Sequence, residues 1–181
     1  MNATGFALFA TQIGHCAIAW SGTGIVGAQL PENDESATRR RMQRRFPNGV
    51  EGSPPAAVQP AIAGITALLR GEPRDLLEIP LAMHDVAPFD RDVYEAARAV
   101  LPGTTVTYGD IAKRIGEPHA AQAVGQALGR NPFAPIVPCH RIVAADGKMH
   151  GFSATGGVTK KLRMLITEGW RSKEPTLFET S

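Results

Sequence analysis

The chain has 181 residues, of which 43% are hydrophobic and 20% charged, and its formal net charge is +2. This length and composition indicate a globular protein of one large or two small domains rather than a disordered chain. Two cysteines without CxxC spacing exclude a redox dithiol, and because no apolar run could cross a membrane we expect a cytoplasmic protein without a membrane partner. Residues 105–171 carry nine Lys or Arg against four Asp or Glu. This bias suits an anionic partner, although a surface bias without function explains it equally well.

Short apolar segments between Gly, Ser and Asn residues open the chain and predict a three-stranded antiparallel meander. The expected order is strands at 5–10, 15–20 and 24–30, helices at 37–46 and 58–70, and a further strand at 76–81. Ser36 is expected to cap the first helix and Gly71 to close the second. We interpret the arginines at 39–41 and 44–45 as a solvated face rather than a specific DNA contact. These elements predict a small α/β domain over residues 1–83.

The second half is predominantly helical. Helices are expected at 89–100, 108–115 and 120–128, and Thr107 has the side chain of a good N-cap for the middle one. Joined by the turn at 116–118, the last two helices form a helix-turn-helix candidate. The final helix has a slim face of small residues, namely Ala120, Ala121, Ala123, Gly125 and Ala127. Such a face suits either close approach to a nucleic-acid groove or packing against another helix.

The run 136–141, Ile-Val-Pro-Cys-His-Arg, places a thiol, an imidazole and a guanidinium side by side. A thiol is nucleophilic as thiolate, which a neighbouring base or positive charge favours. Pro138 stiffens the chain entering Cys139, and the apolar pairs 136–137 and 142–143 predict short buried strands around it. On this run alone an inert core cysteine is the better interpretation. The surrounding motifs reverse that preference.

Several motifs occur together in a fixed order. They are Thr107-Tyr108-Gly109-Asp110-Ile111-Ala112, Ala121-Gln122-Ala123-Val124-Gly125, Asn131-Pro132, Pro138-Cys139-His140-Arg141, and a tail from Gly156-Gly157 through Lys161-Leu162 to Glu168-Gly169. This pattern strongly resembles the O6-alkylguanine-DNA alkyltransferases, also called methylated-DNA–protein-cysteine methyltransferases. The resemblance is dense over residues 86–170 and weak before them.

The resemblance implies an α+β fold. Its N-terminal part would be a small ribonuclease H-like domain with a three-stranded antiparallel sheet, and residues 84–175 a mainly helical, winged-helix-like domain with the helix-turn-helix. It implies a repair protein that binds double-stranded DNA containing O6-alkylguanine, flips the damaged base and takes the alkyl group onto Cys139 once. O4-methylthymine is a further expected substrate. No cofactor is implied, and we expect a monomer in a bacterial-type cytoplasm, on the nucleoid when bound to DNA.

Residue roles follow from the same similarity. His140, acting through a water, would take the proton of the Cys139 thiol, and Glu168 would orient the imidazole. Tyr108 would contact the flipped guanine or its phosphate, and Asn131 would tie the helix-turn-helix to the cysteine loop. The DNA-binding candidates are Tyr108, Ala121, Gln122, Ala123, Gly125, Arg130 and Arg141. The pocket candidates are Ile142, Phe152, Ser153, Thr155 and Lys161, although an exposed helix lysine describes Lys161 equally well.

The chain departs from the family pattern at two places. Gln122 stands where most members have an arginine that fills the gap left by the flipped base, and glutamine lacks its charge and stacking plane. The loop 151–157 is about two residues longer than usual, so either Ser153 or Thr155 could meet O6, with Phe152 as the aromatic wall. We expect this longer loop to alter tolerance for bulky alkyl groups.

Three other interpretations remain open at this point. A non-catalytic sensor of alkylated DNA is the main alternative, although such relatives lack the cysteine that Cys139 supplies here. A DNA-binding regulator is disfavoured because no extra domain is visible. A structural zinc site at His15, Cys16 and His84 is not expected, because adjacent residues on a strand point to opposite faces.

Overall fold

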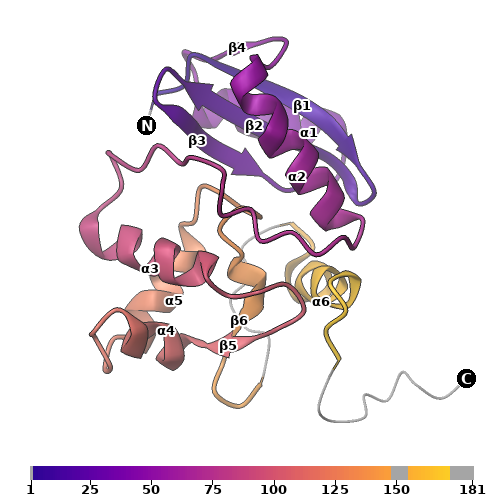
Figure 1. The fold of residues 1–181 in the computed structure, drawn as a ribbon. Helices are drawn as coiled ribbons and strands as arrows, with labels where there is room; N and C mark the ends of the chain where they lie inside the picture. The colour runs from indigo at the N-terminus through magenta and orange to yellow at the C-terminus, as the bar shows by residue number, and fades with distance from the viewer. Residues whose placement is uncertain (1, 148–154, 172–181) are drawn as a thin grey trace, which may run out of the picture.

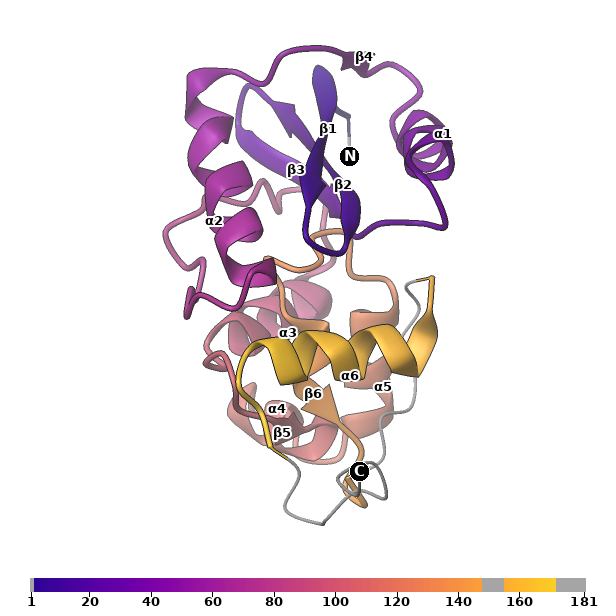
Figure 2. The same ribbon diagram turned by 90° about the vertical axis from the view of Figure 1, so that its right-hand side faces the viewer.

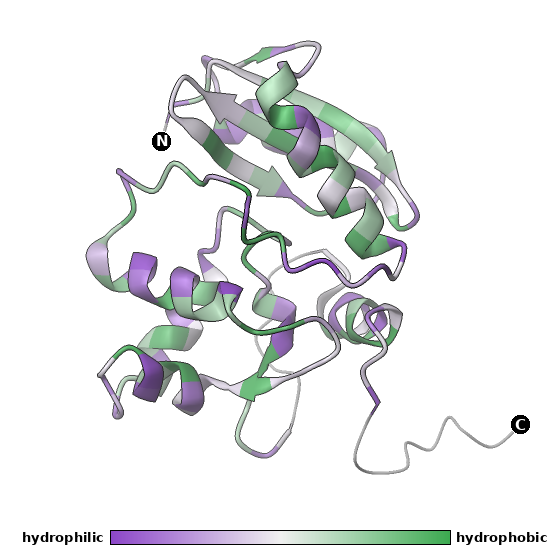
Figure 3. Cartoon of the chain, viewed as in Figure 1, coloured by the Kyte–Doolittle hydropathy of each residue, from purple (hydrophilic) through white to green (hydrophobic). Residues whose placement is uncertain are grey.

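The computed structural model describes residues 2–147 and 155–171. The fold belongs to the α+β class, as predicted, with an N-terminal sheet and its helices lying over a mainly helical C-terminal part (Figure 1). Hydrophobic residues follow the strands and helix α2 (Gln59–Leu69), whereas hydrophilic residues gather on helices α3 (Pro88–Arg98) and α4 (Tyr108–Arg114) (Figure 3). No helix among the described residues is long and apolar enough to cross a membrane.

The N-terminal sheet is mixed and has four strands. Strands β1 (Gly5–Thr11), β2 (Gly14–Ser21) and β3 (Gly24–Gln29) form the predicted antiparallel meander. Strand β4 (Val50–Glu51) pairs parallel with the outer edge of β1, in the order β3-β2-β1-β4, so the prediction of a three-stranded antiparallel sheet is incomplete. Both residues of β4 are exposed, and two residues carry no alternating pattern that could announce a strand.

The two N-terminal helices cover opposite faces of this sheet (Figure 2). Alternate β2 residues serve the two faces: Ala17 and Ala19 belong to the cluster under α1 (Glu35–Arg45), and Ile18 to the cluster under α2. Helix α1 begins two residues before the predicted start, because Asp34 rather than Ser36 is its N-cap and accepts a 2.7 Å hydrogen bond from the Ala37 amide. The short helix η1 (Ala56–Val58) precedes α2.

The strand predicted over residues 76–81 is wrong. Arg98 reaches this segment from α3 and donates to the carbonyls of Leu76, Leu77 and Ile79 at 2.8–2.9 Å. Leu76 has φ of 59°, outside the β region, and only Leu81 makes an isolated bridge to β3. The segment is held by a guanidinium instead of a strand ladder.

The C-terminal part packs its helices around Tyr94, whose hydroxyl donates to the Ala127 carbonyl at 3.0 Å. The order after α3 is β5 (Val106–Thr107), α4, α5 (Ala121–Gly129), η2 (Cys139–Arg141), β6 (Ile142–Val143) and α6 (Gly157–Thr167). Thr107 caps α4 as predicted, in a reciprocal capping box with Asp110. The α4–α5 pair is the predicted helix-turn-helix. Strand β5, which leads into α4, pairs parallel with β6, and the cysteine turn η2 directly precedes β6.

One hydrophobic cluster joins the two parts of the chain. Ile136 from the cysteine loop and Met164 from α6 pack with Ile18 and Leu68 beneath the sheet. Helix α6 lies below the N-terminal sheet and crosses in front of the C-terminal helices α3 and α5 in the view of Figure 2. The division into domains at residues 83 and 84 stays a prediction.

Candidate active site and DNA-facing helix

Asn131 fixes the loop that presents Cys139. Its side-chain amide donates to the Val137 carbonyl at 2.9 Å and its side-chain oxygen accepts from the Phe133 amide at 2.9 Å. The Cys139 amide also donates to the Val137 carbonyl, at 2.9 Å. Ile136 and Val137 are buried but lie in a turn, so the strand predicted before the cysteine is wrong, whereas the one after it is β6. Asn131 thus ties the end of α5 to the cysteine turn, as the sequence predicts.

Three side chains behind the cysteine form a buried charged cluster. His140 Nε2 lies 2.7 Å from Glu168 Oε1, and Arg141 donates to both carboxylate oxygens, from Nε at 3.0 Å and from Nη2 at 2.9 Å. The exposed fractions of the three side chains are 1%, 1% and 3%. The predicted pairing of His140 with Glu168 is therefore present in the structure.

Arg141 does not belong to the DNA-binding surface, which corrects the prediction for this residue. Its buried guanidinium donates to the Glu168 carboxylate and, from Nη1 at 2.6 Å, to the Val100 carbonyl. The sequence could not indicate this, because the partner carboxylate lies 27 residues away. The turn after α3 also contributes the Gly103 amide, 3.3 Å from Glu168 Oε2. Gly103 has φ of 74°, and a Cβ there would meet the Glu168 carbonyl at 2.7 Å, so the turn requires glycine.

Burial and hydrogen bonding set the protonation states of this cluster. Burial alone would raise the pKa of Glu168. The hydrogen bonds of His140 and Arg141, the charge of Arg141 and, at the low pH where His140 is protonated, the charge of His140 lower that pKa to about 2. Burial lowers the pKa of His140 below its ordinary value, and the charge of Glu168 opposes this only in part. The carboxylate is thus ionised and the imidazole neutral, with its Nε2 proton donated to Glu168. Nδ1 of His140 is buried and has no hydrogen-bond partner in the described part of the chain.

The thiol has a mixed environment. Burial raises the pKa of Cys139, and a hydrogen bond from Asn131, the charge of Lys161 and nearby backbone N–H groups lower it in part. Lys161 is 1% exposed and donates to the Ile142 carbonyl at 2.6 Å, so an exposed helix lysine is the wrong interpretation. A thiol of this kind needs a base at the moment of reaction, because it is not a thiolate at rest.

Helix α5 shows one face to solvent and one to the core. Val124, Ala127 and Leu128 are buried, whereas Gln122 is exposed and the small residues Ala121, Ala123 and Gly125 are partly exposed. Gly125 faces the ring of Tyr108, since a Cβ built there would lie 3.8 Å from it. Burial raises the pKa of Tyr108, and the negative charge of a Cys139 thiolate would raise it further. Tyr108 and Cys139 both pack against the hydrophobic cluster of the C-terminal part.

The remaining residues predicted to contact DNA or to line the base pocket are paired within the protein, buried or outside the described residues. Arg130 makes three hydrogen bonds to the Asp90 carboxylate at 2.9–3.2 Å, so its guanidinium already has an acidic partner. Thr155 donates to the Glu32 carboxylate of the N-terminal part. Ile142 is fully buried in β6. Phe152 and Ser153, and with them most of the longer loop, lie outside the described residues.

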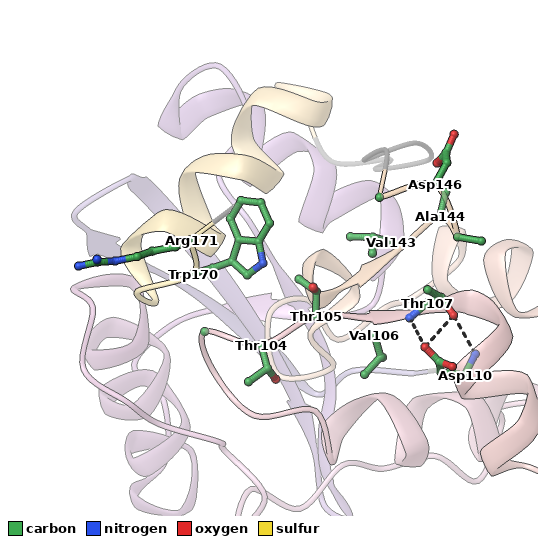
Figure 4. Close-up of a pocket in the computed structure, with 13 residues that line it drawn as sticks. Thr104, Thr105, Val106, Thr107, Asp110, Val143, Ala144, Asp146, Trp170 and Arg171 are labelled. Carbon is green, nitrogen blue, oxygen red and sulfur yellow. Dashed lines mark hydrogen bonds between the residues drawn. The ribbon is translucent and has the colours of Figure 1, made fainter. Parts of the chain in front are cut away.

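A cavity of about 810 Å³ opens beside β5 and β6 rather than over the cysteine (Figure 4). Trp170 and Asp146 flank it on opposite sides, and the capping pair Thr107 and Asp110 forms part of its wall. Cys139 does not line it. This cavity therefore lies beside the strand that follows the cysteine turn, and the cysteine itself is not among its lining residues.

The structure thus sets a cysteine, backed by a buried His-Glu pair, beside a helix-turn-helix. The family described as 6-O-methylguanine DNA methyltransferase, DNA binding domain, matches residues 88–170. A methylated-DNA–protein-cysteine methyltransferase of Mycobacterium tuberculosis is 40% identical over 129 residues, which are 69% of this chain and 74% of the relative. The chain belongs to the O6-methylguanine DNA methyltransferase family.

Two further comparisons extend over the N-terminal part. The regulatory protein Ada of Salmonella typhimurium is 33% identical over 93% of this chain, and the matched region is 46% of the relative, so the chain spans about half the length of that protein. The crystal structure of the Mycobacterium tuberculosis protein OGT in complex with DNA superposes with a TM-score of 0.72 at 28% identity, covering 93% of this chain and 94% of that one. The α+β fold is thus shared over nearly the whole length.

Proposed function

We propose that this protein repairs DNA by moving the alkyl group, typically methyl, of O6-alkylguanine and of O4-methylthymine onto its own Cys139. The observation that carries the proposal is the cluster behind the cysteine. A neutral His140 is oriented by the ionised Glu168, and its Nδ1, which has no hydrogen-bond partner among the described residues, belongs to the residue next to Cys139. Membership of the family and the alkyl-transferring relatives support it.

The reaction is a displacement at the alkyl carbon. The thiol proton passes to His140 Nδ1 through a water, the sulfur forms a bond to the alkyl carbon, and the bond from that carbon to O6 breaks with its electron pair going to guanine. Guanine, still attached to its DNA strand, takes up one proton from solvent and is restored to the normal base. The new thioether has no leaving group that would regenerate the thiol, so each molecule reacts once.

Access to O6 requires that the base leave the helical stack, at a cost of a few kcal/mol. Helix α5 supplies a face of small side chains that suits the narrow minor groove, and the ring of Tyr108 lies beside Gly125 of this helix. The relative crystallised with DNA has the same fold, which supports DNA as the partner.

Mass analysis of the intact protein and its peptides tests the proposal. After incubation with duplex DNA containing O6-methylguanine, we expect one added methyl group on the peptide holding Cys139, and none on Cys16, whose burial raises its pKa to about 12. Cys139→Ser should bind the same DNA and remain unmodified. Wild-type protein that binds the DNA tightly but gains no methyl group would instead identify a sensor.

Gln122 offers a second test, of base flipping. Because Gln122 is exposed on α5, Gln122→Arg adds a charge and a stacking plane without disturbing the core. We expect repair of duplex DNA to become about tenfold faster, from roughly 1–2 kcal/mol of added contact. The rate on free O6-benzylguanine, which needs no flipping, should stay the same. An unchanged or slower duplex rate would refute this role for position 122.

A further inference from the structure

Arg141 binds both oxygens of the Glu168 carboxylate, although a single contact would be enough to balance its charge. Oε1 of Glu168 accepts from His140 Nε2 and Arg141 Nη2, and Oε2 accepts from Arg141 Nε and the Gly103 amide. A carboxylate has about four acceptor sites. All of them are filled, so no site remains to receive a proton.

The guanidinium is itself fixed from three sides. Its Nε and Nη2 form the two-pronged contact with the carboxylate, and Nη1 donates to the Val100 carbonyl at the end of α3. A planar fork held in this way sets the plane of the carboxylate as well as its position. Lysine could supply the charge but not the plane.

We propose that Arg141 is a positioning residue for alkyl transfer: by filling both oxygens of Glu168 it makes this carboxylate orient His140 without accepting its proton. The inference rests on the proposed function. The proton taken from the thiol then remains on His140 Nδ1, and Nε2 keeps its own proton throughout.

The charged groups around His140 decide the sign of the expected effect. Those that face it in the described structure are Glu168 after α6, Lys161 within α6, and Cys139 and Arg141 of η2. Burial lowers the pKa of His140 most, Glu168 raises it, and the charges of Arg141 and Lys161 lower it. Without Arg141, no guanidinium charge would offset the effect of the Glu168 carboxylate on the imidazole. Its pKa would rise, and protonated His140 cannot serve as a base.

Two readouts test the proposal, namely the single-turnover methyl-transfer rate against pH and the NMR titration of the His140 imidazole in unreacted protein. Arg141→Met should move the acidic limb of the rate profile and the imidazole pKa upward together, by about one pH unit, which means about tenfold slower transfer on that limb. Arg141→Lys should slow transfer at every pH with a smaller shift, because it keeps the charge and loses the fork. Arg163→Met, which removes an exposed charge from α6, should change neither readout.

A uniform loss of rate with an unmoved imidazole pKa would assign Arg141 a purely structural role and overturn the proposal. If Arg141→Met does not fold, the same two readouts are taken on Arg141→Lys. An unmoved imidazole pKa or an unaltered transfer rate in that variant would count against the proposal. If wild-type protein transfers no methyl group, the proposed function fails, whereas the titration still shows whether Arg141 sets the protonation of His140.

Discussion

Glu168→Gln is expected to lower the free energy of unfolding at pH 7 by about 3–5 kcal/mol, the usual cost of removing one partner from a buried ion pair. The guanidinium of Arg141 would remain buried without a counter-charge. The NH₂ group of the new glutamine would face N–H donors that the carboxylate now accepts from. Urea unfolding followed by circular dichroism measures this. The matched surface change is Asp90→Asn at the Arg130 pair, whose arginine is 59% exposed, and it should cost no more than about 1 kcal/mol.

The combination of Glu168→Gln with Arg141→Met sharpens the test. If the cost of the single change comes from a stranded charge, the double variant should be more stable than the sum of the two single losses predicts. Strict additivity would mean that the two side chains do not act as a pair.

The same carboxylate gives a pH signature. Because the folded pKa of Glu168 is lowered to about 2 from an unfolded value near 4.3, its contribution to stability is complete above the unfolded value and is lost as the pH falls toward 2. The stability difference between wild type and Glu168→Gln should therefore be constant from about pH 5 upward and shrink between about pH 4 and 2. A difference that persists at pH 2 would contradict the assigned ionisation.

His140→Ala is expected to slow alkyl transfer at pH 7 by about 10²–10⁴-fold, the range that general bases contribute. Burial raises the pKa of the Cys139 thiol, so the variant has almost no thiolate and no base to produce it. Its rate should climb steadily as hydroxide takes over that task at higher pH. Rapid-quench measurements with excess protein over O6-methylguanine DNA give the rate directly.

Two controls accompany this prediction. Cys139→Ser should show no transfer at any pH, which separates slow chemistry from hydrolysis of the substrate. Binding of undamaged duplex by His140→Ala should match the wild type, since this imidazole is 1% exposed and cannot reach the DNA. A rate at pH 7 within tenfold of the wild type would rule out His140 as the base.

The sequence was most informative where local chemistry decides the structure. The Thr107 cap and the meander follow from short-range patterns, and the family resemblance indicated the Asn131 contact together with Cys139, His140 and Glu168. Prediction failed where a distant partner decides. Arg98 prevents a strand at 76–81 by binding its carbonyls, and Arg45, expected in solvent, donates to the Pro132 carbonyl at 3.0 Å. Arg141 is the strongest case, because the resemblance predicts a DNA contact for it, whereas the structure buries it against Glu168, 27 residues away.

Helix α6 is anchored at both ends to different parts of the molecule. Near its start, Thr155 and Lys160 bind Glu32 and Pro31 of the N-terminal part, and just past its end Glu168 holds the imidazole. Eleven helical residues make a stiff rod of about 16 Å. Through this helix, the sheet that begins the chain is connected to the carboxylate that holds the imidazole of His140.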